Sequence, residues 1–190
     1  VRDQYIHRFK IHFPNEERSA GRPVRTRPVY ETQRDMGAVF GLNAGWEHPL
    51  WFADSPDSVE TVGFGRQNWF GPVGREAAML RDHLGIIDIS NFAKYVVEGS
   101  GAHSWLDALV ANHVPTEVGR SCLTPLIGMR GGVAGDFTIT RTGDNSFMMI
   151  GSGMAERYHK RFFDMVPLPE GTTLENATPR IAGFNVAGPK

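Results

Sequence analysis

The 190-residue sequence has little cysteine, no long apolar run and no excess of either charge. Its single cysteine, Cys122, cannot form a disulfide within the chain or build a zinc site alone. The apolar runs are shorter than the roughly 18 residues that a transmembrane helix needs, and 20 Lys and Arg against 21 Asp and Glu give a formal net charge of −1. We therefore expect no membrane span, no nucleic-acid partner and a reducing compartment, the cytoplasm or, in a eukaryote, the mitochondrial matrix.

Several motifs with known chemistry are also missing. The seven histidines are scattered without a His-x-x-x-His pair or a His/Cys cluster, so we expect no metal site. Gly151-Ser152-Gly153 follows an expected strand, but Glu156 stands where a dinucleotide fingerprint needs its third glycine, and a carboxylate there would repel a pyrophosphate. There is no Gly-x-Ser-x-Gly elbow. Cys122 lies in an apolar stretch, which favours a buried, inert thiol.

What is present suits a globular domain, with 41% hydrophobic and 22% charged residues. Residues 1–34 are basic and are interrupted by Pro14, Pro23 and Pro28, which indicates an extended, solvated connecting segment. Residues 36–72 are rich in glycine and aromatics and predict irregular loops whose rings anchor them to a core. Such rings could also line a flat pocket for a ring-shaped ligand.

Regular periodicity begins at Arg75. Helices are expected over residues 75–84, 102–110 and 153–165, and strands over 86–90, 95–98, 122–127, 137–141 and 146–150. The strongest pattern is the apolar stripe within 102–110, which predicts a core helix rather than a cofactor site. The order predicts an α+β fold with an antiparallel sheet and packed helices. The chain ends on an apolar, strand-like run from Ile181, so we expect it to be part of a longer protein.

One further segment stands out, because Gly131-Gly132 leads into an expected strand with Asp136 at its start. Glycines allow a flat ligand to approach the backbone closely. A carboxylate beside such a surface can hold a ligand amine and manage its proton. Without further context Asp136 would be an ordinary carboxylate at a strand edge.

An ordered set of motifs around this segment resembles a known family. The motifs are Gly37-Ala-Val-Phe-Gly41, Gly45-Trp-Glu47, Pro49-Leu-Trp-Phe52, Asp88-Ile-Ser90, Phe92-Ala-Lys94, Gly119-Arg120, Arg130-Gly-Gly132 and Asp136. Together they resemble the glycine-cleavage T-protein (aminomethyltransferase) folate-binding family. The form that follows a flavin domain in dimethylglycine and sarcosine dehydrogenases is the nearest, because residues 5–30 resemble the linker from that domain.

The resemblance implies that residues 1–34 are a linker from a missing flavin domain and that residues 35–190 are the N-terminal half of a folate-binding domain. It implies a catalytic role for Asp136 and an N-methylated amine as the substrate of the whole enzyme, which would use tetrahydrofolate together with FAD in the upstream domain. The remaining polypeptide would be the partner of this segment. The residues implied to bind folate are Phe92, Leu123, Gly131, Gly132, Gly151 and Ser152.

The sequence departs from the family at three points. Leu123 stands where tyrosine is common, Gly128 stands where asparagine is common, and the family domain is about twice as long. We therefore expect this fragment alone to be inactive and to bind folate poorly. Two alternatives stay open: a non-catalytic regulatory or interaction module of the same fold, and a T-protein-like methyltransferase or demethylase with another substrate, such as a sulfonium compound.

Overall fold

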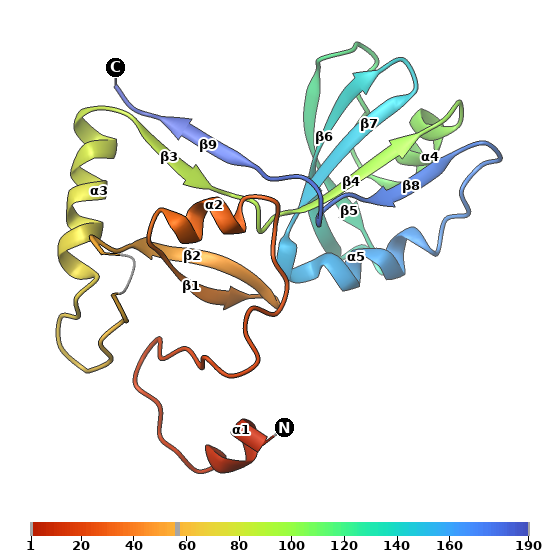
Figure 1. The fold of residues 1–190 in the computed structure, drawn as a ribbon. Coiled ribbons are helices and arrows are strands. Elements are labelled where there is room, and N and C mark those ends of the chain that lie inside the picture. The colour runs from red at the N-terminus through yellow and green to blue at the C-terminus, as the bar shows by residue number, and fades with distance from the viewer. Residues whose placement is uncertain (1, 56–57, 190) are drawn as a thin grey trace. The chain divides into compact units, whose positions relative to one another are not determined.

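The computed structural model describes residues 2–55 and 58–189 (Figure 1). The chain divides into two compact units, which are described separately. Unit 1 comprises Val1–Asp88 and Gly183–Lys190, and unit 2 comprises Ile89–Ala182. The expected boundary between residues 34 and 35 concerns the whole enzyme and stays a prediction.

The described residues of unit 1 form two small antiparallel sheets and three helices. Strand β3 pairs with β9, so the apolar run at the end of the sequence does form a strand. The elements of unit 1 are α1 (Arg2–Ile6), α2 (Tyr30–Asp35), β1 (Ala38–Asn43), β2 (Trp46–Phe52), α3 (Phe70–Asp82), β3 (Gly85–Asp88) and β9 (Phe184–Ala187).

The segment expected to be irregular, residues 36–72, instead opens with the β1–β2 hairpin. Ala44 and Gly45 form its turn with φ angles of 52° and 82°. Two successive positive φ angles are what a type I′ turn requires, and this turn matches the twist of paired strands. Trp46 and Trp51 on β2 are buried, so the aromatic side chains do anchor the segment, as expected. The expectation of loops was wrong because an alanine rarely signals a left-handed turn.

The basic N-terminal segment lies on this hairpin. The guanidinium carbons of Arg25 and Arg27 lie 3.7 Å and 4.2 Å from the ring centroid of Trp46. The Arg22 guanidinium pairs with the buried Glu47 carboxylate. The expectation of a solvated segment was therefore wrong at these positions, because cation–π and ionic contacts hold it against the hairpin.

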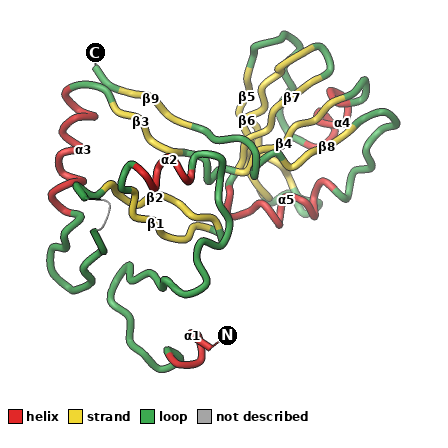
Figure 2. The backbone as a smooth tube through the Cα atoms, in the orientation of Figure 1, coloured by secondary structure: helices red, strands yellow, loops and turns green. Residues whose placement is uncertain are grey.

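Unit 2 is built on one five-stranded antiparallel sheet with the strand order β5-β6-β7-β4-β8 (Figure 2). The sequence neighbours β6 and β7 form a hairpin, whereas β4 reaches β7 and β8 from elsewhere in the chain. The elements are β4 (Ala93–Glu98), α4 (Ala102–Leu109), β5 (Ser121–Ile127), β6 (Val133–Gly143), β7 (Ser146–Gly151), the short 3-10 helix η1 (Gly153–Ala155), α5 (Glu156–Phe163) and β8 (Thr173–Asn176).

The core of unit 2 lies between one face of this sheet and helices α4 and α5. The alternation of side chains along β4, β6 and β7 directs one set of apolar residues to that face. The stripe predicted on α4 packs there, which confirms it as a core element. The cluster includes Tyr95, Trp105, Leu106, Leu109, Phe137, Ile139, Phe147, Met149 and Phe163.

The mixed architecture confirms the predicted α+β class with an antiparallel sheet and packed helices. The expected helix at 75–84 begins earlier, at Phe70, and ends at Asp82. Strand β8 was not predicted, because its four residues are mostly exposed and carry little apolar alternation. No helix in residues 2–55 and 58–189 is both long and apolar enough to cross a membrane.

Candidate functional site

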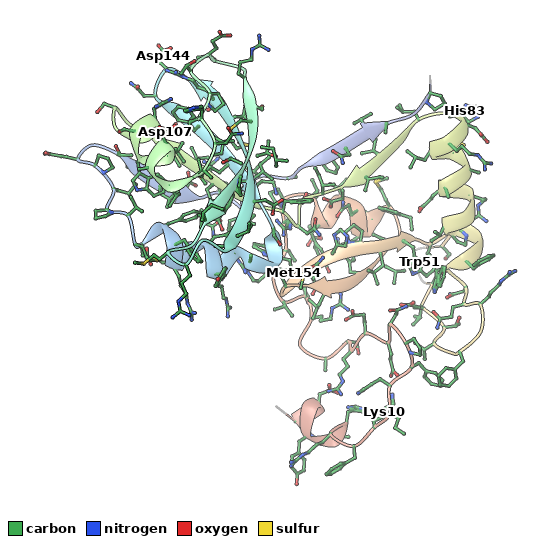
Figure 3. The ribbon with its side chains drawn as sticks, turned by 180° about the vertical axis from the view of Figure 1, so that it is seen from behind. Lys10, Trp51, His83, Asp107, Asp144 and Met154 are labelled. Atoms are coloured by element: carbon green, nitrogen blue, oxygen red, sulfur yellow. The ribbon has the colours of Figure 1, made fainter. Side chains whose placement is uncertain are left out.

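The register of the sheet brings most of the predicted site residues to one end. Phe137 on β6 pairs with Gly151 on β7, and Gly151 pairs with Ala93 on β4. The next residue on each chain segment, toward the same end of the sheet, is Asp136, Ser152 or Phe92. We call these three residues the candidate row. Figure 3 shows the orientation of the hairpin, with Asp144 in the β6–β7 turn at one end and Met154, just after Ser152, at the other. The candidate row is at the Met154 end.

Asp136 is exposed, whereas the next residue on the strand, Phe137, is completely buried. Neighbouring side chains on a strand point to opposite faces. Phe137 belongs to the core beneath the sheet, so the Asp136 carboxylate lies on the face opposite α4 and α5. We call this surface, which also carries Leu123, Thr138 and Ile150, the Asp136 face.

The Asp136 face combines a carboxylate with apolar surface. Leu123 is opposite Thr138, and Thr138 is opposite Ile150. Leu123 is 67% exposed and has no tyrosine-like hydroxyl to offer a ligand. The Asp136 face therefore presents aliphatic surface at Leu123 and Ile150 to a ligand, with hydrogen-bonding groups at Asp136 and Thr138.

Two loops that carry predicted residues touch at the edge of this face. A Cβ placed on Gly153 would lie 1.6 Å from the carbonyl oxygen of Asn91, so only glycine fits there. The Lys94 ammonium donates hydrogen bonds to the carbonyls of Ser90, at 3.0 Å, and Phe92, at 2.9 Å. These contacts hold the backbone of Phe92 beside the Ser152–Gly153 segment. The glycine that resembled part of a nucleotide fingerprint thus serves close packing.

Gly131 and Gly132 lie in the β5–β6 turn, apart from the row. Gly131 has a φ of 77°, and its N–H donates to the Gly128 carbonyl at 2.8 Å. The Gly128 N–H in turn donates to the Gly132 carbonyl at 2.8 Å. The turn geometry accounts for this glycine pair, and its role in ligand binding stays a prediction.

Gly151 is buried, and its Cβ position faces the core side of the sheet. A Cβ at Gly151 would lie 2.6 Å from the Phe137 ring and 3.1 Å from Cε1 of His159, so the glycine leaves room for both rings. His159 was not a predicted site residue. The sequence did predict a helix over 153–165, but with Tyr158, Phe162 and Phe163 as its notable aromatic residues. The spacing of His159 and Phe163, both buried, was the signal that could have found it.

The environment of Cys122 suits the predicted inert thiol. It is a free, partly buried cysteine on β5, and burial raises the pKa of its thiol. A raised pKa keeps the group protonated and weakly nucleophilic. Among the described residues, no group of three or more His, Cys, Asp or Glu side chains is arranged to hold a metal ion.

Three cavities formed by the described residues lie away from Asp136. Two cavities of about 740 Å³ and 590 Å³ are lined by residues of unit 1, and one of about 240 Å³ by residues of unit 2 around Leu109 and Phe162. Asp136 lines none of these three. A ligand held at Asp136 would be covered only on one side by unit 2.

Residues 29–190 match the GCVT N-terminal domain. The chain belongs to that family. The GCVT N-terminal domain described here is 32% identical to mouse dimethylglycine dehydrogenase, mitochondrial, over 193 residues, which cover 100% of this chain and 22% of the relative. It is 26% identical to the mouse pyruvate dehydrogenase phosphatase regulatory subunit, mitochondrial, over 190 residues, which cover 96% of this chain and 22% of the relative. The chain thus spans less than a quarter of the length of these relatives.

A solved structure shares the fold of this GCVT N-terminal domain. The glycine cleavage system aminomethyltransferase T from Bartonella henselae superposes with a TM-score of 0.64 and 23% identity, covering 88% of this chain and 41% of that one. The family resemblance drawn from the sequence motifs is confirmed. The likeness to the solved structure concerns the fold alone, and the roles of individual residues stay predictions.

Proposed function

We propose that this chain is the folate-binding part of an enzyme that demethylates a small N-methylated amine, and that it captures the released one-carbon unit on tetrahydrofolate. The observation that carries the proposal is the exposed Asp136 carboxylate on a sheet face that also presents Leu123, Thr138 and Ile150, next to the Phe92 and Ser152 loops. Membership of the family and the similarity to mouse dimethylglycine dehydrogenase support it.

The residues on this face suit a folate. Leu123 and Ile150 offer apolar contact to one side of a flat ring, and Phe92, which is 43% exposed, could cover its edge. Asp136 would accept a hydrogen bond from a ring amine. Tetrahydrofolate would supply the two nucleophilic nitrogens that take up the carbon.

Asp136 would act in two ways during the transfer. Its negative charge would stabilise the cationic iminium carbon as it approaches. As a general base it would accept a proton from a folate nitrogen, while the second nitrogen's proton leaves with the demethylated amine. Two C–N bonds to the carbon form and the C=N bond of the iminium is lost. No electron is transferred in this step, because the oxidation that creates the iminium precedes it.

That oxidation would belong to an FAD domain elsewhere in the full-length protein. Unit 2 covers a ligand at Asp136 only on one side, so we propose that the remaining polypeptide completes the binding site. On this proposal the isolated chain is inactive. The mouse relatives are mitochondrial by name, and for a eukaryotic source we propose the mitochondrial matrix.

A second candidate is a non-catalytic regulatory module of the same fold. The similarity to the pyruvate dehydrogenase phosphatase regulatory subunit favours it, as does Leu123 in place of a hydroxyl-bearing residue. The carboxylate at Asp136 favours the enzyme.

The test compares Asp136→Ala with a matched control, Asp144→Ala, in the full-length protein. Asp144 is also an exposed aspartate of the β6–β7 hairpin, but it lies at the opposite end (Figure 3). Asp136→Ala should lower the rate of methylenetetrahydrofolate formation by at least about tenfold, as expected on losing one proton-handling group, and Asp144→Ala should not. Tetrahydrofolate binding without turnover in the unmodified protein would favour the regulatory module. Turnover of a sulfonium compound instead of an amine would favour the third alternative.

A further inference from the structure

A buried histidine lies directly beneath the strands that carry the candidate site. His159 on α5 is 1% exposed, and its ring centroid is 4.6 Å from that of Phe137. The proposed transfer makes no use of this imidazole. The imidazole lies on the core side of the sheet, under the Asp136 face, and this position indicates a further role.

The histidine ring packs against the backbone at two glycines. A Cβ at Gly135 would lie 3.3 Å from Nε2 of His159, and a Cβ at Gly151 would lie 3.1 Å from Cε1. Gly135 immediately precedes Asp136, and Gly151 immediately precedes Ser152. The ring therefore occupies the space that both glycines leave open, and it supports the two strands where they present these side chains.

A hydrogen bond fixes the orientation of the ring. The Tyr95 hydroxyl donates to the carbonyl oxygen of Glu156 at 3.3 Å, and its oxygen is 3.1 Å from Nδ1 of His159. A hydroxyl has one proton to donate, so when that proton goes to the Glu156 carbonyl, Nδ1 donates to the tyrosine oxygen. In that tautomer Nε2 is the unprotonated nitrogen. It is buried and has no hydrogen-bond partner among the described residues.

We propose that His159 is a positioning residue for the Asp136 carboxylate, acting through the backbone of Gly135 from the core side of the sheet. This inference rests on the proposed function only where it concerns catalysis. The packing of the His159 ring against Gly135, the residue before Asp136, stands on the geometry of unit 2 alone.

The charges around the imidazole agree with this arrangement. Burial lowers the pKa of His159, while the negative charges of Asp136 and Glu156 act in the opposite direction. Tyr95 is the third titratable group that faces the ring, and burial raises its pKa. Asp136 directly follows Gly135, whose backbone packs against the ring, although its side chain lies on the opposite face of the sheet.

The first experiment follows the His159 ring by NMR during a pH titration of the 190-residue chain. Replacing Asp136 by Asn should lower the pKa of His159 further, because a negative charge that favours the imidazolium is lost. Asp144→Asn should leave it unchanged, and Glu156→Gln should lower it as well. A His159 titration that is the same with and without the Asp136 charge would overturn the proposal.

The second experiment measures positioning in the full-length enzyme. Tyr95→Phe keeps the ring volume but removes the oxygen that holds Nδ1, and we expect kcat for methylenetetrahydrofolate formation to fall about threefold with KM for the amine unchanged. His159→Leu should lower kcat about tenfold. Wild-type kcat in both variants, each shown to be folded, would contradict the proposal. Tyr95→Phe keeps the test valid if His159→Leu does not fold.

A double-mutant cycle separates positioning from simple packing. Gly135→Ala pushes a methyl group toward Nε2 and should lower kcat, while the same change in the His159→Ala background should cost much less because the space is free. Additive effects on kcat would indicate that the two residues act independently, against the proposal. If the full-length protein proves unable to use folate, the proposed function fails, but the NMR titration still decides whether His159 and Asp136 are linked.

Discussion

The carbonyl oxygen of Asn91 occupies the place where a side chain on Gly153 would begin, 1.6 Å from an ideal Cβ. This contact locks the loop before β4 to the loop after β7, and Phe92 and Ser152 reach the candidate site through these loops. The atom in the way is a backbone oxygen of Asn91, so no change of side-chain rotamer can make room for a methyl group on Gly153.

Gly153→Ala should therefore force the two loops apart. We expect a loss of about 3 kcal/mol in the free energy of unfolding, the upper range for overpacking, and weaker tetrahydrofolate binding in the full-length protein. Urea denaturation measures the first effect. The control is Gly132→Ala, where a Cβ meets nothing within 4 Å. Equal stability of the two variants would contradict the tight contact.

The Arg22–Glu47 pair should stabilise unit 1 strongly. Burial alone would raise the pKa of Glu47, but hydrogen bonds from Arg22 and the Val24 N–H hold it below its usual value. Glu47→Ala leaves a partly buried guanidinium without its acceptor and should cost about 3 kcal/mol. Glu31→Ala, at an exposed ion pair with Arg34, should cost less than about 1 kcal/mol. Thermal unfolding of both variants tests the contrast.

Stability should fall on mild acidification. Burial lowers the pKa of both His48 and His159 below the ordinary value of 6.5. The unfolded chain then takes up protons that the folded chain does not, so their contribution is complete above about pH 6.5 and decreases as the pH falls toward the folded-state values. His159→Leu should flatten the decline in urea midpoint between about pH 7 and pH 5. Replacing the exposed His113 by Gln should leave the slope unchanged, and a slope unaltered by His159→Leu would be the contrary result.

Leu123→Tyr should strengthen folate binding. Leu123 is 67% exposed on the Asp136 face, so a larger side chain fits there without disturbing the core. A new hydroxyl donor close to the ligand would contribute about 1 kcal/mol, or about fivefold in affinity. Equilibrium binding of tetrahydrofolate to the full-length protein measures it. Unchanged or weaker binding would mean that the ligand does not contact this part of the face.

Side-chain periodicity was enough to predict much of unit 2. The stripe on α4 and the alternation around Phe137 are local patterns that point to one face, so the core and the exposure of Asp136 follow from them. The β1–β2 hairpin escaped prediction because its turn uses Ala44, a residue that seldom adopts positive φ. The pattern of apolar and polar residues along the chain does not indicate which non-glycine residue adopts a positive φ angle.

The site was harder to predict than the core. Asp136, Ser152 and Phe92 could be named individually, but their common row depends on strand register between distant segments. The roles of His159 and Gly153 depend on contacts with residues elsewhere in the chain, Gly135 and Asn91. Such contacts leave no periodic signal, which is why the glycine of an incomplete nucleotide fingerprint proved to be a packing residue.

The most direct test of the account replaces the Asp136 carboxylate by an amide of the same shape. In the full-length protein, Asp136→Asn should retain its fold and its oxidation of the amine but form methylenetetrahydrofolate at least about tenfold more slowly, with the one-carbon unit released as formaldehyde. Methylenetetrahydrofolate formation at the unmodified rate would show that this carboxylate does not handle the transferred carbon.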